Sequence, residues 1–123
     1  MVNDNTRKYE RNAELLPSAE PFYTEGMGWA IRTRYNATAS STIDIEYRPA
    51  GKGDWLPYEK NRKASYGKVD IHGQQAMGDD SKNLRGGLYE VRLRVKENQQ
   101  YGPWTGTLVA VPFYFQPRNW MPL

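Results

Sequence analysis

Apolar and polar residues alternate along three stretches of the chain, as they do in strands that bury one face. The stretches cover residues 29–37, 42–48 and 89–96, and the last is the most regular of the three. A helix would not keep a period of two over eight residues. Each stretch therefore predicts a half-buried β-strand. The inward positions are Trp29, Ile31, Thr33, Tyr35 and Ala37, then Ile43, Ile45 and Tyr47, then Tyr89, Val91, Leu93 and Val95.

Shorter elements are predicted between these strands. Residues 49–53, PAGKG, form a turn, and Trp55, Leu56 and Tyr58 begin a short return strand. The polar residues 59–65 are expected to form a loop. A further strand is predicted over 66–72, and the Gly- and Gln-rich stretch 73–83 is expected to form a long loop.

The last predicted strand is apolar on both of its faces. After a turn over 97–103, the run 104–115 places Val109 and Val111 on one face and Leu108 and Ala110 on the other. A strand with two apolar faces needs cover on both sides, either from the N-terminal arm or from another molecule. Pro112 places the end of this strand at a sheet edge.

Neither end of the chain has a pattern that closes a core. We expect an N-terminal arm over 1–22, a β-sandwich over 23–115 and a C-terminal tail over 116–123. A short helical turn over Tyr9–Leu16, ended by Pro17, is expected within the arm.

Length and composition limit the classes of protein that remain. The chain has 123 residues, which suits one domain, and no cysteine, so packing has to hold the fold without disulfides. The net charge of +3 is too small to indicate a nucleic-acid binder. No apolar run approaches the roughly 18 residues of a membrane span. The polar opening, residues 1–12, lacks the apolar core of a signal peptide, which predicts synthesis and retention in the cytoplasm.

Candidate catalytic and metal-binding chemistry is sparse. His72 is the single histidine, and nothing in the sequence pairs it with a nucleophile and an acid. Asp79 and Asp80 lie in a predicted loop without the ligand spacing of a calcium loop. We therefore expect no enzyme, no metal and no cofactor.

Three segments resemble a fibronectin type III domain. Residues 43–55, IDIEYRPAGKGDW, resemble the third strand and following turn of that family, and 84–89, LRGGLY, resemble the corner before strand F. Residues 89–104, YEVRLRVKENQQYGPW, resemble the hairpin from strand F to strand G. The resemblance implies an all-β fold, a single antiparallel β-sandwich of about seven strands with immunoglobulin-like topology.

The resemblance also places the third strand beside strand F. Outward Asp44 and Glu46 would then pair with outward Arg92 and Arg94 across the ladder. The alternative is a solvated sheet face that mixed charges keep soluble.

The aromatic residues fall into two groups. Trp29, Tyr47, Tyr89 and Trp55 are expected in the core or at its corner. Large side chains in the loop and the two ends are candidates for contacts with a partner, because Tyr and Trp are enriched at binding hot spots. The alternative is that Trp104 caps one end of the sandwich and that Trp120 is disordered. The candidate partner-binding residues are Tyr9, Leu15, Leu16, Tyr101, Trp104, Trp120 and Leu123.

Free-standing fibronectin-like domains without a signal peptide are common in tailed-bacteriophage particles. The resemblance thus implies a virion protein, a capsid decoration, collar or tail accessory, that binds other virion proteins in many copies. The alternative is a carbohydrate-binding module that stacks Tyr101 and Trp104 on a host glycan. A nucleic-acid binder ranks last, since Lys60, Arg62 and Lys63 form the one local basic cluster.

Overall fold

The computed structural model describes residues 15, 17–73 and 83–113, and within them the chain forms eight β-strands. A single 3₁₀ turn, η1 (Ala64–Tyr66), precedes β5, and these residues contain no α-helix and no helix that could span a membrane. The all-β prediction is confirmed. The strands are β1 (Ser18–Thr24), β2 (Gly28–Arg34), β3 (Thr42–Pro49), β4 (Leu56–Lys63), β5 (Lys68–His72), β6 (Gly87–Glu97), β7 (Gln100–Tyr101) and β8 (Thr105–Val111).

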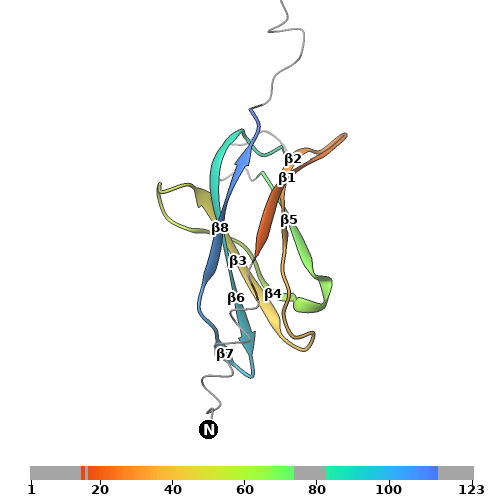
Figure 1. Ribbon diagram of the computed structural model, residues 1–123, viewed down its shortest axis with the longest axis vertical. Coiled ribbons are helices and arrows are strands. Elements are labelled where there is room, and N and C mark those ends of the chain that lie inside the picture. The colour runs from red at the N-terminus through yellow and green to blue at the C-terminus, as the bar shows by residue number, and fades with distance from the viewer. Residues whose placement is uncertain (1–14, 16, 74–82, 114–123) are drawn as a thin grey trace, which may run out of the picture.

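The strands form two antiparallel sheets that pack as a sandwich (Figure 1). One sheet has three strands in the order β1-β2-β5. The other has five, in the order β4-β3-β6, and both β7 and β8 pair with β6 on its far side. This arrangement confirms the expected antiparallel β-sandwich.

The core lies between the two sheets and consists of the alternate residues that the sequence pattern predicts. Buried side chains from β2 and β5 face those from β3, β6 and β8. Fully burying each large aliphatic side chain is worth about 1.5–3 kcal/mol relative to leaving it exposed. The buried strand residues include Ile31, Ile43, Ile45, Tyr47, Val69, Ile71, Tyr89, Val91, Leu93, Val95, Val109 and Val111.

Strand β1 lies within the segment that was expected to be an arm. It pairs with β2 along its whole length, from Ser18 opposite Arg34 to Thr24 opposite Gly28. The sheet therefore starts at Ser18, before the predicted sandwich boundary at residue 23. The sequence pattern does not indicate this strand, because Phe22 and Tyr23 are adjacent large apolar residues and Pro21 comes directly before them. Together they break the alternation of apolar and polar residues.

Strand β4 replaces most of the loop that was predicted over 59–65. Its polar composition is that of an edge strand, with β3 on one side and, within the described ranges, no strand of the same sheet on the other. Its register against β3 shifts twice, and Asn61 has a φ of 59° at this irregularity. The loop prediction is wrong here because edge strands need few apolar residues.

Side chains of β4 cover the free edge of β5 in the opposite sheet. The Tyr58 hydroxyl donates a hydrogen bond to the Asp70 carbonyl oxygen (2.9 Å) and accepts one from the His72 N–H (3.2 Å). Arg62 Nε donates to the Lys68 carbonyl oxygen at 3.0 Å. Three backbone groups on this edge of β5, which a neighbouring strand would need for pairing, are thus already bonded to side chains.

Candidate functional site

The outward face of the five-stranded sheet carries an ordered set of side chains, because register places specific residues opposite one another on β3, β6 and β8. Leu88 lies opposite Ala110, and Glu90 lies between Arg48 and Leu108. The next row holds Glu46, Arg92 and Gly106, and the row after that holds Asp44 and Arg94. Thr42, Lys96 and Tyr101 form the last row. Opposite residues of an antiparallel pair share a face, so all of these lie on one surface.

Three arginines and three aromatic rings stack alternately across the middle of this face. Arg92 Cζ lies 4.2 Å from the ring centroids of both Trp55 and Trp104, so its guanidinium lies between the two indoles. Arg94 Cζ lies 4.5 Å from the Trp104 ring and 3.8 Å from the Tyr101 ring. Arg48 Cζ adds a further contact to Trp55 at 4.2 Å. We call these six residues, Arg48, Trp55, Arg92, Arg94, Tyr101 and Trp104, the ladder.

Carboxylates hold the arginines of the ladder in place. Arg92 Nε donates to Glu46 at 2.9 Å, and Arg94 Nε donates to Asp44 at 3.1 Å. These are the two cross-strand pairs that alternation and the expected topology predicted, and the prediction is confirmed. Each cation–π contact at a partly exposed site is worth about 0.5–1 kcal/mol, so the stack fixes its own geometry.

Glu90 holds the Arg48 end of the ladder. Its carboxylate accepts a hydrogen bond from the Gly51 N–H at 2.6 Å and another from Arg48 Nε at 3.1 Å. The Gly51 N–H, followed by Arg48, keeps the pKa of Glu90 below its usual value. This ties the β3–β4 turn to β6.

Trp55 was expected in the core and lies on the outward face instead. Leu56 pairs with the buried Tyr47, so the residue before it points the other way. The signal was present in the sequence, because only one of two adjacent residues in a strand can face the core. With Leu56 as the inward residue, the same pattern predicts Trp55 on the outward face, where Arg92 lies.

A shallow hollow and an apolar patch adjoin the ladder. The hollow, of about 360 Å³, has Trp55, Arg92, Trp104 and Leu108 among its lining residues. Gly106 also lines it, and the absent side chain leaves the space open. Leu108 and Leu88 are 58% and 51% exposed, and we call these two residues with Ala110 the apolar end. The expected cover for the outward face of this strand is absent among the described residues.

The structure describes three of the seven predicted partner-binding residues. Tyr101 and Trp104 lie together in the ladder, with Tyr101 53% exposed. Leu15 is fully buried in the core of its own chain, where it anchors the segment before β1. Tyr9, Leu16, Trp120 and Leu123 lie outside the described residues, as do Asp79, Asp80 and the 116–123 tail.

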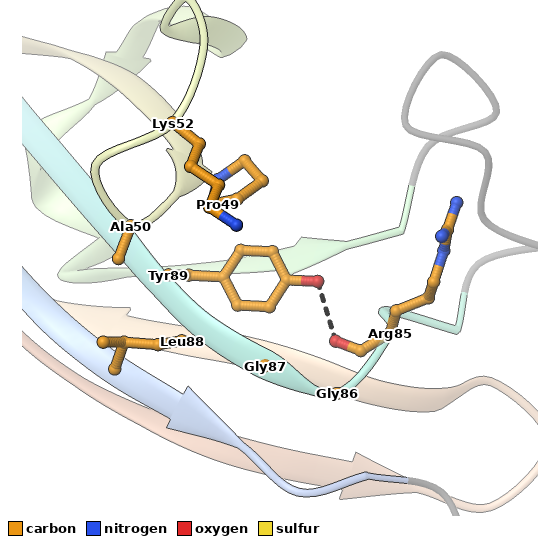
Figure 2. Close-up of a pocket in the computed structure, with 8 residues that line it drawn as sticks. All are labelled: Pro49, Ala50, Lys52, Arg85, Gly86, Gly87, Leu88 and Tyr89. Carbon is orange, nitrogen blue, oxygen red and sulfur yellow. Dashed lines mark hydrogen bonds between the residues drawn. The ribbon is translucent and has the colours of Figure 1, made fainter.

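A second hollow, of about 430 Å³, lies where the β3–β4 turn meets the corner before β6. Figure 2 shows the Tyr89 ring there, with Pro49 and Lys52 on the turn side and Arg85 at the end of the hydroxyl. The Tyr89 hydroxyl donates to the Arg85 carbonyl oxygen at 2.7 Å. This is the tyrosine-corner arrangement of β-sandwiches, so the hollow has a structural explanation.

A metal site needs several His, Cys, Asp or Glu side chains close together. The described residues include no group of three His, Asp or Glu side chains that could hold a metal ion. In the other sheet, Arg32 Nε and Nη2 donate to the Asp70 carboxylate at 2.8 and 2.9 Å. Arg32 keeps the pKa of Asp70 below its usual value, and this pair joins two neighbouring strands.

No family model matches the chain, and no curated protein matches it. The interpretation of the outward face therefore rests on its geometry.

Proposed function

We propose that this chain is a non-enzymatic protein-binding module that docks on a neighbouring protein through the ladder and the apolar end. The observation that carries the proposal is the exposure of Leu88 and Leu108 beside a hollow lined by two tryptophans. Exposed apolar patches rimmed by polar residues mark interaction sites. Trp, Tyr and Arg are also the residue types that dominate binding energy at interfaces.

The ladder suits binding because its side chains are already ordered. Arg92 touches two rings and one carboxylate, and Arg94 does the same. Free arginine and aromatic side chains lose rotamer entropy on binding, at about 0.5–1.5 kcal/mol each. A partner that meets the ladder avoids much of this cost. The surface is therefore prepared for a rigid contact.

The setting we propose is the particle of a tailed bacteriophage. The chain would be a capsid decoration, collar or tail accessory, assembled in the host cytoplasm and bound in many copies to other virion proteins. This setting rests on the resemblance to fibronectin type III domains. The position of β6 between β3 and β8 agrees with the topology that this resemblance implies for strand F.

The experiment that tests the proposal is sedimentation of purified particles from the source of the chain. We expect the native chain to sediment with the particle and the Trp104→Ala/Leu108→Asp variant to stay in the soluble fraction. Tyr66→Ser is the control, because Tyr66 is about as exposed as Leu108 but lies outside the outward face. Thermal unfolding of each variant checks that the fold is intact.

Two results would contradict the proposal. Absence of the native chain from purified particles would remove the virion setting. Equal sedimentation of the native chain and of a folded Trp104→Ala/Leu108→Asp variant would remove the outward face as the docking surface.

The glycan alternative receives less support from the geometry. A sugar ring stacks on an open aromatic face, whereas guanidinium groups lie against the rings of Trp55, Trp104 and Tyr101. Protein partners do not need a free ring face. We therefore place protein binding first.

A further inference from the structure

The outward face ends, opposite its apolar end, in a row of basic and polar residues. Thr42 lies opposite Lys63 on β4 and opposite Lys96 on β6, and Lys96 in turn lies opposite Tyr101 on β7. Neighbouring side chains in such a row have Cβ atoms about 5 Å apart, so only a threonine separates the two lysines. We call Lys63, Thr42, Lys96 and Tyr101 the basic end.

A hollow of about 380 Å³ opens at the basic end. Its lining residues are all polar and come from the start of β3 and the chain before it, from β4, and from the end of β6 with the β6–β7 turn. Six residues from three separate segments thus converge on one space. They are Ser40, Thr42, Asn61, Lys96, Asn98 and Gln99.

Three residues with positive φ line this same hollow. Asn61, Asn98 and Gln99 have φ values of 59°, 52° and 66°, and they are the non-glycine residues with positive φ in the described ranges. Asn98 and Gln99 are the two central residues of the β6–β7 hairpin, a turn that favours positive φ at both positions. Asn61 lies where the register of β4 against β3 shifts. Local backbone geometry thus places three amide side chains around the hollow.

The charge at the basic end is unbalanced. Lys63 and Lys96 form no ion pair with the residues described, whereas Arg48, Arg92 and Arg94 each have a carboxylate. Asp44, in the row next to Thr42 and Lys96, already accepts hydrogen bonds from Arg94 and from the Asn61 N–H at 3.0 Å. The hollow therefore presents Lys96 and three amide side chains to a ligand, and Lys63, the second cation without an ion pair in the described ranges, lies beside it across Thr42.

We propose that the basic end binds an acidic segment of the protein partner, with carboxylates between Lys63 and Lys96 above Thr42. A short acidic segment is favoured over a phosphate backbone, because Asp44, Glu46 and Glu90 alternate with the arginines on the same face and leave no continuous basic track for a long anionic strand. This inference rests on the proposed protein-binding function and specifies the partner.

Titration of the isolated full chain with an oligoglutamate peptide tests the proposal, read out by amide chemical shifts in NMR. Shifts are expected at Thr42, Lys96, Asn98 and Gln99. In Lys63→Gln/Lys96→Gln the dissociation constant should rise about tenfold, which corresponds to about 1.4 kcal/mol. Arg34→Gln/Lys52→Gln removes the same net charge from exposed positions elsewhere and should leave binding unchanged.

Each other outcome overturns the inference. An equal loss in both double variants would show attraction by net charge alone. Tighter binding of an oligothymidylate than of oligoglutamate would assign the site to nucleic acid. Shifts confined to other surfaces would remove the hollow as the site.

The two proposals fail separately. If Trp104→Ala/Leu108→Asp abolishes docking on the particle while Lys63→Gln/Lys96→Gln docks normally and oligoglutamate causes no shifts, the docking face stands and the acidic partner does not. If oligoglutamate binds as expected but the chain is absent from particles, the acid-binding site stands and the virion setting does not.

Discussion

Asp44 lies directly opposite Arg94 where β3 pairs with β6, and its buried carboxylate binds that guanidinium. A second hydrogen bond, from the Asn61 N–H, ties the same carboxylate to the irregular part of β4. One acid thus links three strands and lies where the ladder meets the basic end. Its burial makes its partner important for stability.

Arg94→Leu is expected to lower the free energy of unfolding by about 3 kcal/mol, because it leaves a buried carboxylate without its cation. Asp44→Asn in the same background should restore part of the loss. Chemical denaturation of both single variants and the double variant measures the coupling. Strictly additive losses would contradict it.

The ion pair of Asp70 with Arg32 should make the free energy of unfolding depend on pH in the acid range. Because Arg32 lowers the pKa of Asp70 in the folded state, its stabilisation is complete above the unfolded-state pKa of about 3.9 and disappears as the pH falls through the lower folded value. Asp70→Asn should be less stable than the native chain at pH 7, by about 2 kcal/mol, and the difference should shrink in acid. Thermal unfolding against pH measures this. Asp54→Asn, at an exposed position before β4, is the control and should be as stable as the native chain at pH 7.

Replacing Thr33 by valine is expected to stabilise the fold. Thr33 is fully buried on β2, and its hydroxyl oxygen has no hydrogen-bond partner among the described residues. Thr33→Val keeps the shape and removes the unsatisfied group, so the free energy of unfolding should rise by about 1 kcal/mol. Thr33→Ala, which leaves a cavity, should be less stable than Thr33→Val. A destabilised valine variant would show that the hydroxyl is bonded.

Tyr89→Phe removes the hydroxyl that bonds to the Arg85 carbonyl. The fold should lose about 1–2 kcal/mol, since the carbonyl loses its partner at the corner before β6. Urea denaturation measures the loss. Tyr101→Phe, at an exposed position, is the control and should be nearly neutral. Equal stabilities of the two variants would argue against the corner.

Sequence reasoning predicted the parts of the fold that depend on a period of two. The strands around Ile31, Ile45 and Val91 lie in the sandwich as alternation indicated, with the predicted residues buried. It missed β1 and the polar second half of β4, because edge strands bury less and carry Pro21 and the polar run after Tyr58. Local pattern is weakest where a strand has one neighbour.

The candidate site was predicted in part. Tyr101 and Trp104 were selected because they are large rings in a predicted loop, and Arg92 and Arg94 were placed outward by alternation. Their assembly with Trp55 depends on the register of β3 against both β4 and β6, which tertiary pairing sets. The basic end depends on the same register, because Lys63 and Lys96 are far apart in sequence.

The bonds from Tyr58 and Arg62 to β5 also affect how copies of this chain can crowd together. An exposed strand edge is a template on which a neighbouring chain can extend the sheet, and dense packing increases that hazard. On this flank the carbonyls of Lys68 and Asp70 and the N–H of His72 are bonded to side chains of the same molecule. A copy that met this edge would have to break these three bonds before a continuous sheet could form, so the side chains of β4 oppose fibre growth from this flank.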